Sequence, residues 1–346
     1  MFSWKWRLSE LKQDKPVDVF STFSCGGGST MGYKRAGFRV LGNCEIDPRM
    51  NEVYKRNHHP ALNYLMDLRD FNALNDLPEE LFHLDILDGS PPCSTFSSAG
   101  LREEAWQKEK VFREGQKKQT LDDLFFVFLD TVEKLKPRIV VAENVTGLIQ
   151  GNARGYVNEI IKRFHAAGYE VQLFRLNAAF MDVPQARERI FFIANNQGFP
   201  KLRLSFNHKP ITFGEVRSEK GIPINPETAP ATVEYLKHMR PEDKEVADIK
   251  LRLYGKHTCF NNKIYRDCDV GPTLTSSGQS IRGYDKTWLS AEDCVNVSTF
   301  PQDYDFGDES PKYVCGMSVP PNMMANIATE IWKQWLEKDK GIEGKT

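Results

Sequence analysis

Four residues carry side chains that could act together on one substrate: the thiol of Cys93, the carboxyl group of Glu143, and the guanidinium groups of Arg187 and Arg189. The double proline Pro91-Pro92 directly precedes the thiol and restricts the backbone that aims it. Glu143 follows an apolar run that predicts a buried strand, and the two arginines directly precede another such run. A positioned thiol beside these groups indicates nucleophilic catalysis on an anionic or carbonyl-rich substrate.

Each of these residues also has a structural explanation when it is considered alone. Cys93 could simply occupy a turn, and Glu143 could be a cap or a solvated charge. Alternation along a strand puts Arg187 and Arg189 on one face, where both could also be solvated at a strand edge. The catalytic interpretation therefore depends on the four residues occurring together.

A second group of residues indicates a nucleoside ligand. The glycine-rich segment 23–30 follows the first predicted strand and opens the first predicted helix, where a backbone can approach a ligand closely. Glu45 ends the second predicted strand, a position suited to accept hydrogen bonds from a ribose diol. Asp67 could add a further polar contact. The alternatives are a tight turn for the glycines and a helix cap for Asp67.

The elements that must position these residues alternate between short apolar runs and amphipathic stretches. The predicted strands are 17–23, 38–44, 84–88, 138–142, 169–176 and 190–194. The predicted helices are 30–36, 48–57, 121–136 and 156–167. This βαβ order predicts an α/β fold with a doubly wound, mostly parallel sheet, whose ligands bind at the carboxyl ends of the strands.

The alternation stops near residue 195, and turn-forming residues then predict a smaller, less regular domain. A helical pattern returns at 321–338 and predicts a last helix that packs on the first domain. We therefore expect a catalytic and cofactor-binding domain at 1–195, a target-recognition domain at 196–304, and a C-terminal segment at 305–346 that returns to the catalytic domain.

Composition excludes several classes of protein. The 346 residues include 46 Lys+Arg and 47 Asp+Glu, so the formal net charge of −1 rules out a histone-like polycation. The chain has neither a signal-peptide pattern nor an apolar run that could span a membrane, and we expect a cytoplasmic monomer. Its seven cysteines contain no CxxC pair, which predicts free thiols rather than disulfides or a structural metal site.

Taken in chain order, these segments resemble the cytosine-C5 DNA methyltransferase family over nearly the whole chain. The segments that carry the resemblance are 23–28, Glu45, Pro92-Cys93, Glu143-Asn144-Val145, Gln185-Ala186-Arg187-Glu188-Arg189, Phe300-Pro301 and 316–321. The resemblance implies a Rossmann-like fold of the S-adenosylmethionine-dependent methyltransferase type, with a smaller target-recognition domain.

The resemblance also implies a reaction, in which the thiolate of Cys93 adds to C6 of a cytosine flipped out of duplex DNA. Glu143 then binds the N3 and N4 edge of the base, Arg189 holds O2 and orients Glu143, and Arg187 tunes the surroundings of the nucleophile. Residues implied to bind the S-adenosylmethionine cofactor are Phe23, Cys25, Gly26, Gly27, Gly28, Glu45, Ile46, Asp67, Leu68, Pro92, Leu121, Ser318 and Val319.

Four positions depart from the family pattern: Cys25 in the glycine loop, Ser94 after the nucleophile, Thr287 at an expected basic position, and Met317 in the closing motif. None of them removes a catalytic group. Three alternatives stay open: a tRNA cytosine-C5 methyltransferase, faintly indicated by Cys259-Phe260, a non-catalytic DNA-binding member of the family, and a nucleotide-dependent oxidoreductase.

Two basic segments are candidates for contact with duplex DNA. Segment 97–118 carries six basic residues and two glycines, which suits a loop that closes over DNA, although a solvated helix would look the same. Segment 250–266 interleaves five basic residues with three aromatic residues and contains no acidic residue, so we expect it to recognise the target. A cognate restriction endonuclease acting on the same site, without direct contact, is a further expected partner.

Overall fold

The computed structural model describes residues 1–92, 123–149, 154–255 and 262–343. Their contacts divide the chain into two compact units. The first, called the sheet unit below, comprises residues 11–176, 188–205 and 324–346. The second, called the small unit, comprises residues 1–10, 177–187 and 206–323. Cys93, Leu121 and segment 97–118 lie outside the described residues.

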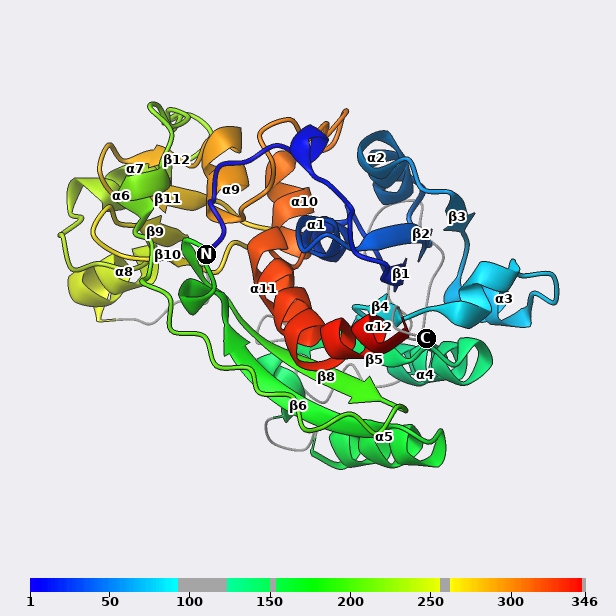
Figure 1. Cartoon of the computed structure of the whole chain (residues 1–346). Coiled ribbons are helices and arrows are strands. Elements are labelled where there is room, and N and C mark those ends of the chain that lie inside the picture. The colour runs from blue at the N-terminus through cyan, green and yellow to red at the C-terminus, as the bar shows by residue number, and fades with distance from the viewer. Residues whose placement is uncertain (93–122, 150–153, 256–261, 344–346) are drawn as a thin grey trace. The chain divides into compact units, whose positions relative to one another are not determined.

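Among the described residues, the sheet unit holds a seven-stranded sheet in the order β3-β2-β1-β4-β5-β8-β6 (Figure 1). The strands are β1 (Asp18–Thr22), β2 (Arg39–Glu45), β3 (Leu62–Leu65), β4 (Ile86–Gly89), β5 (Ile139–Val145), β6 (Glu170–Asn177) and β8 (Glu188–Asn195). Strands β3, β2, β1, β4 and β5 pair in parallel, whereas β8 runs antiparallel to β5. The predicted α/β fold with a mostly parallel sheet is confirmed.

Helices connect the parallel strands, as the alternation in the sequence predicts. They are α1 (Gly28–Arg35), α2 (Pro48–His58), α3 (Leu68–Ala73), α4 (Leu124–Leu135) and α5 (Arg154–Ala166). Single 3₁₀ turns occur at Glu79–His83 and Thr146–Ile149. The prediction missed β3 and α3, which have only four and six residues and are too short to show a hydrophobic period.

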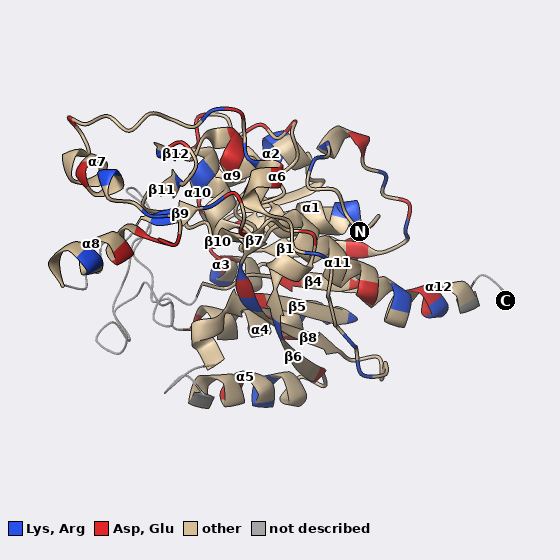
Figure 2. Ribbon diagram, turned by 90° about the vertical axis from the view of Figure 1, so that its left-hand side faces the viewer, with Lys and Arg blue, Asp and Glu red and all other residues tan. Residues whose placement is uncertain are grey.

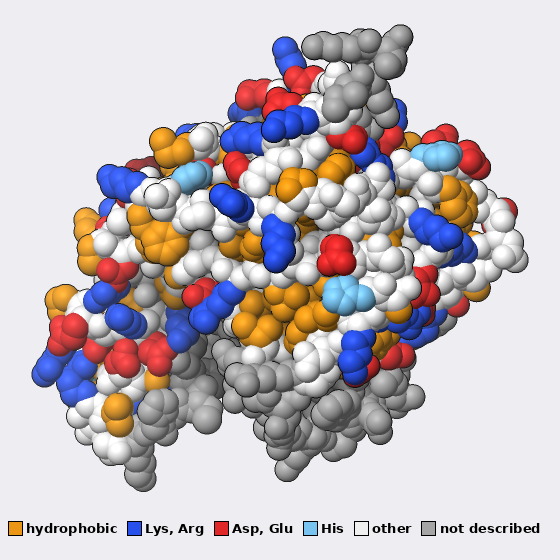
Figure 3. All heavy atoms as spheres, turned by 60° about the horizontal axis from the view of Figure 1, so that its bottom comes forward, with side chains coloured by type: hydrophobic (Ala, Val, Ile, Leu, Met, Phe, Trp, Pro, Cys, Tyr) orange, Lys and Arg blue, Asp and Glu red, His pale blue; other side chains and the backbone are white. Residues whose placement is uncertain are grey.

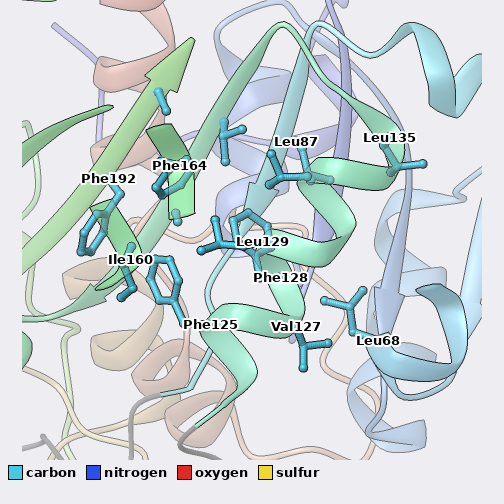
Figure 4. Packing of buried hydrophobic residues seen from close by; sticks show 14 of the residues in the cluster. Leu68, Leu87, Phe125, Val127, Phe128, Leu129, Leu135, Ile160, Phe164 and Phe192 are labelled. Carbon is cyan, nitrogen blue, oxygen red and sulfur yellow. The ribbon is translucent and has the colours of Figure 1, made fainter. Parts of the chain in front are cut away.

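The core of the sheet unit lies between α3, α4, α5 and one face of the sheet. Phe125 and Phe128 of α4 pack with Phe164 of α5 and Phe192 of β8, and all four side chains are almost fully buried (Figure 4). Alternate strand residues such as Ile86 also have no exposed surface, so both faces of the sheet are covered. Because both faces are covered, the strand sequences are nearly continuous apolar runs and do not alternate between apolar and polar residues.

The small unit combines short helices with two small sheets. Its helices are α6 (Phe213–Val216), α7 (Pro230–Lys237), α8 (Val246–Tyr254), α9 (Ala291–Val297) and α10 (Pro311–Met317). The strands are β7 (Gln185–Ala186), β9 (Lys263–Tyr265), β10 (Gly271–Pro272), β11 (Ser280–Arg282) and β12 (Thr287–Trp288), and 3₁₀ turns lie at Leu8–Glu10 and Ala178–Phe180. Such short elements agree with the irregular pattern of this part of the sequence.

The C-terminal helix begins in the small unit and continues into the sheet unit. Helix α11 (Pro321–Ile331) runs through a π-helical turn at Trp332–Leu336 into α12 (Glu337–Glu343). The chain passes from the sheet unit into the small unit after residue 205 and returns to the sheet unit after residue 323. The predicted functional boundaries lie at 195 and 304. No helix in the described ranges is long and apolar enough to span a membrane.

Candidate active site

The glycine-rich loop between β1 and α1 is built on left-handed backbone conformations. Phe23, Cys25 and Gly27 have φ angles of 52°, 46° and 82°. A Cβ atom at Gly27 would lie 2.2 Å from Nε2 of the buried His58 side chain, so this position has no room for a larger residue. Glycine at position 27 is therefore required both by the turn and by the packing of α2 against it.

Glu45, the last residue of β2, binds the loop that follows β1. Its carboxylate accepts hydrogen bonds from the backbone N–H groups of Cys25 at 2.7 Å and of Ile46 and Asp47 at 2.9 Å each. The residue is 8% exposed, and burial raises the pKa of its carboxyl group even though the three N–H groups oppose that shift. The predicted ribose-binding residue thus shapes the loop directly.

A cluster of three asparagine side chains supports the same loop, and the sequence analysis missed it. Asn43 donates a hydrogen bond to Ser24 Oγ at 2.9 Å, and its amide oxygen accepts one from Asn63 at 2.7 Å. Asn51 and Asn63 complete the cluster through bonds of 2.7 and 3.1 Å. No sequence signal identified these residues, because their spacing matches no motif and only the sheet brings them together.

A small pocket opens beside the loop, at the carboxyl ends of β1, β2 and β3. It is lined by Phe23, Cys44, Ile46, Met66, Asp67, Leu68 and Leu124. Four predicted cofactor residues, Phe23, Ile46, Asp67 and Leu68, are therefore together. Asp67 also caps α3 by accepting a hydrogen bond from Arg69 N–H at 2.8 Å, so the helix-cap interpretation is confirmed and its contact with the cofactor stays a prediction.

The turn after β4 is tied to β5 by Asn144, which the sequence analysis did not assign a role. Its side-chain amide donates a hydrogen bond to the carbonyl of Pro91 at 3.1 Å, two residues before Cys93. Its amide oxygen accepts a bond from Val145 N–H at 2.9 Å. The described part of the turn, which ends at Pro92, is thus held at the carboxyl end of the strand that carries Glu143.

Glu143 forms an ion pair with Arg189. Arg189 Nε lies 2.8 Å from Glu143 Oε1, and the two side chains are only 15% and 11% exposed. Arg189 also donates to the carbonyl of Glu188 at 2.7 Å, which fixes the orientation of the guanidinium group. The predicted neighbours Glu143 and Arg189 are thus in contact within the sheet unit.

The structure corrects the expectation that alternation along one strand puts Arg187 and Arg189 on the same face. Arg187 N–H donates to the carbonyl of Gln185, so the chain turns there instead of continuing as a strand. The Arg187 side chain is 3% exposed and donates to the carbonyls of Leu274 and Gly316 at 3.1 and 3.2 Å. Arg187 belongs to the small unit, whereas Arg189 belongs to the sheet unit.

Two other predicted cofactor residues also belong to the small unit. Ser318 ends α10 and donates its hydroxyl group to the carbonyl of Val314 at 2.8 Å, and both Ser318 and Val319 are buried. Their assignment to the cofactor stays a prediction.

The basic character predicted for 250–266 is largely neutralised by acidic residues outside that segment. Arg252 forms two bonds of 2.6 and 2.9 Å to Asp243. Lys263 pairs with Glu245, and Arg266 pairs with Asp269. Helix α8 accordingly shows both charge signs in Figure 2, and basic and acidic side chains are interspersed on the face drawn in Figure 3. Three of the five basic side chains of the segment are therefore paired with acids, and its role in target recognition stays a prediction.

The described ranges include five of the seven cysteines. Cys44, Cys268 and Cys294 are free thiols there, and no cluster of three or more His, Cys, Asp or Glu residues among the described positions could hold a metal ion.

The fold and these side chains define a Rossmann-like domain that carries a small pocket beside a glycine-rich loop and a carboxylate held by an arginine. A family model described as C-5 cytosine-specific DNA methylase matches residues 17–333. The chain therefore belongs to this family, which confirms the resemblance seen in the sequence.

Individual relatives agree with this assignment. The Type II methyltransferase M.FnuDI of Fusobacterium nucleatum is 33% identical over 177 residues, which are 51% of this chain and 46% of the relative. The chain thus spans about half the length of M.FnuDI. The Type II methyltransferase M.AplI of Arthrospira platensis is 26% identical over 348 residues, 96% of this chain and 92% of the relative.

A solved structure supports the fold. A DNMT2 mutant of Spodoptera frugiperda matches with a TM-score of 0.61 at 14% identity, covering 91% of this chain and 99% of the other. At this identity the match shows the fold alone.

Replacing Asn144 by alanine tests whether this residue holds the turn. Asn144→Ala removes the donor to a buried carbonyl, so the free energy of unfolding should fall by about 1–3 kcal/mol. Backbone amides in residues 86–92 should also exchange with deuterium faster. Asn57→Ala is the matched control, because Asn57 also donates to a carbonyl, that of Val53 within α2. Equal exchange of 86–92 in the Asn144→Ala and wild-type proteins would show that another contact fixes the turn.

Proposed function

We propose that this protein transfers a methyl group from S-adenosylmethionine to C5 of a cytosine in duplex DNA, through a covalent adduct with Cys93. The observation that carries the proposal is the ion pair of Glu143 and Arg189 beside the turn that Asn144 holds. This arrangement supplies a proton-sharing carboxyl group next to the backbone that leads to the thiol. Family membership supports the reaction class.

The proposed reaction begins at C6, because C5 of cytosine is a poor nucleophile. The thiolate of Cys93 forms a bond to C6 while N3 gains a proton shared with Glu143, and C5 becomes enamine-like. C5 would then take the methyl group as the sulfur–methyl bond of S-adenosylmethionine breaks, with S-adenosylhomocysteine as the leaving group. Loss of the C5 proton and elimination of the thiolate release 5-methylcytosine and regenerate Cys93.

Arg189 has a positioning and electrostatic role in this scheme. Its bond to Glu143 at 2.8 Å orients the carboxyl group, and its bond to the Glu188 carbonyl prevents the guanidinium group from turning away. Both side chains are largely removed from water, which strengthens their interaction with charge that develops on the base. The proposed contact of Arg189 with O2 of the cytosine would use its remaining N–H groups.

The pocket beside the glycine loop suits an adenosyl group. Phe23, Ile46 and Leu68 offer apolar surface, and Asp67 offers carboxylate oxygens at one side. Glu45 stands next to the pocket residues Cys44 and Ile46, and its three bonds to backbone N–H groups leave a lone pair on Oε2 for a ribose hydroxyl group. When bound, S-adenosylmethionine supplies an electrophilic methyl group.

Duplex DNA is the proposed partner, and the cytosine must leave the base stack to reach Cys93. Flipping one base costs a few kcal/mol, which protein contacts must offset. Since Arg252, Lys263 and Arg266 are engaged with acidic residues, the proposed recognition of the target by 250–266 depends on other side chains of that segment, such as the exposed Tyr254.

A calorimetric titration tests the cofactor site. Glu45→Ala should weaken S-adenosylmethionine binding by about 1.5–3 kcal/mol, because the cofactor loses charge-assisted hydrogen bonds and the glycine loop loses its acceptor. Glu52→Ala is the control, since Glu52 lies exposed on α2 and pairs only with Lys55 and Arg56 in the described structure. An unchanged dissociation constant for Glu45→Ala would mean that the loop is only a turn.

Covalent trapping tests the reaction itself. Long duplex DNA of varied sequence, with 5-fluorocytosine in place of cytosine throughout, presents many short candidate targets, and fluorine cannot leave C5 as a proton does. The wild-type protein with S-adenosylmethionine should form an adduct that survives denaturation, and peptide mapping should find it at Cys93. Cys93→Ser should abolish the adduct. Glu143→Gln should slow its formation by roughly two to three orders of magnitude.

An adduct at Cys25, or methylation that persists in the Cys93→Ser protein, would contradict the assignment of the nucleophile.

A further inference from the structure

A buried carboxyl group outside the proposed catalytic set lies at the carboxyl end of β4. Asp88 is 2% exposed and has no role in the scheme above. It accepts a hydrogen bond from Ser21 Oγ of β1 at 2.8 Å and another from Tyr33 Oη of α1 at 3.1 Å. The side chain therefore joins three elements at the edge of the sheet where the turn toward Cys93 begins.

The backbone around Asp88 is held as firmly as its side chain. Thr22 donates its hydroxyl group to the Asp88 carbonyl at 3.1 Å. A Cβ atom on the next residue, Gly89, would lie 2.5 Å from the Phe128 ring and 2.7 Å from Thr22 Oγ1. The end of β4 is thus packed closely on both faces, and its direction fixes how the following Pro91-Pro92 turn departs.

Strand register brings Asp88 close to Glu143. Asp88 pairs with Val141 across the parallel β4–β5 pair, and Glu143 lies two residues further along β5. Residues two apart in a strand point to the same face, so Asp88 and Glu143 are diagonal neighbours. Arg189 lies on the other side of Glu143 and pairs with it, so three charged side chains form a row across three adjacent strands.

The surroundings of Asp88 place its titration near neutral pH. Burial, the largest effect, raises the pKa of Asp88 to about 7, the hydrogen bonds from Ser21 and Tyr33 oppose this shift, and the charge of Glu143 adds to it. Tyr54 of α2 also interacts electrostatically with Asp88. Burial raises the pKa values of Tyr33 and Tyr54, so both phenols stay neutral.

We propose that Asp88 is a positioning residue for methyl transfer: its ionised carboxylate fixes the end of β4 and places a negative charge beside Glu143. This inference rests on the proposed function, because Glu143 is the group that shares a proton with N3 of the cytosine. When Asp88 is ionised, both of its oxygens accept the hydroxyl groups of Ser21 and Tyr33. When it is protonated, one oxygen becomes a donor and the negative charge beside Glu143 disappears.

The test compares wild-type protein with Asp88→Asn across pH. Asparagine is isosteric and resembles the protonated acid, so the two proteins should form the 5-fluorocytosine adduct at similar rates near pH 6. Near pH 8 the wild-type protein should form the adduct about five- to fifty-fold faster than Asp88→Asn. This is the expected effect of one charge on a diagonal neighbour when the effective dielectric constant is near 20. The ratio of the two rates should rise with pH, with a midpoint near pH 7.

Two further variants separate the charge of Asp88 from its structural role. Tyr33→Phe removes a donor that stabilises the ionised form of Asp88, so the midpoint of the pH-dependent increase should move to higher pH. Asp85→Asn is the control, because Asp85 is another buried acid and pairs with Arg138 at the opposite end of β4. The ratio of the wild-type rate of adduct formation to the Asp85→Asn rate should not change between pH 6 and 8. Circular dichroism and cofactor titration check that each variant is folded.

A ratio that is flat between pH 6 and 8 for Asp88→Asn would overturn the inference while leaving the proposed function intact. Absence of any adduct in the wild-type protein would instead overturn the proposed function. If Asp88→Asn does not fold, the midpoint shift in Tyr33→Phe decides the question, and an unshifted profile in that variant would also overturn the inference.

Discussion

The antiparallel pairing of β8 with β5 is the constraint on which the site depends. In this register Arg189 lies opposite Val145 and Phe191 lies opposite Glu143, so Arg189 and Glu143 are diagonal neighbours on one face. A slip by one residue would turn Arg189 to the other face and leave the buried Glu143 carboxylate without its cation. The apolar side chains of Ile190 and Phe192, which fill the core on the α4 side, fix that register.

Neighbouring parallel strands then bring their own groups to the same edge. Strand β2 ends in Glu45, β4 leads into the turn before Cys93, and β5 carries Glu143 and Asn144. Each acid has a different environment: Glu45 binds backbone N–H groups, Glu143 binds a guanidinium group, and Asp88 binds hydroxyl groups. The three carboxyl groups at the strand ends therefore differ in role. Glu45 binds the loop, and in the proposed reaction Glu143 shares a proton and Asp88 is a positioning residue.

The sequence predicted the main strands, four of the helices and the residues Glu45, Glu143 and Arg189, because alternating elements and motif order are local signals. It could not separate Arg187 from Arg189, since the turn at Gln185 depends on contacts made by residues far along the chain. Partners such as Asp243 for Arg252, and the asparagine cluster around Asn43, also arise only from tertiary packing.

Exchange of the C5 hydrogen without cofactor tests most directly whether this edge of the sheet activates cytosine by covalent addition. Duplex DNA labelled with tritium at C5 of cytosine is incubated with the protein alone, and tritium released to water is counted. Addition of Cys93 to C6, with proton sharing by Glu143, predicts release by the wild-type protein, strongly reduced release by Glu143→Gln, and none by Cys93→Ser. Equal release by the wild-type and Cys93→Ser proteins, or no release from DNA that the wild-type protein methylates, would contradict this account.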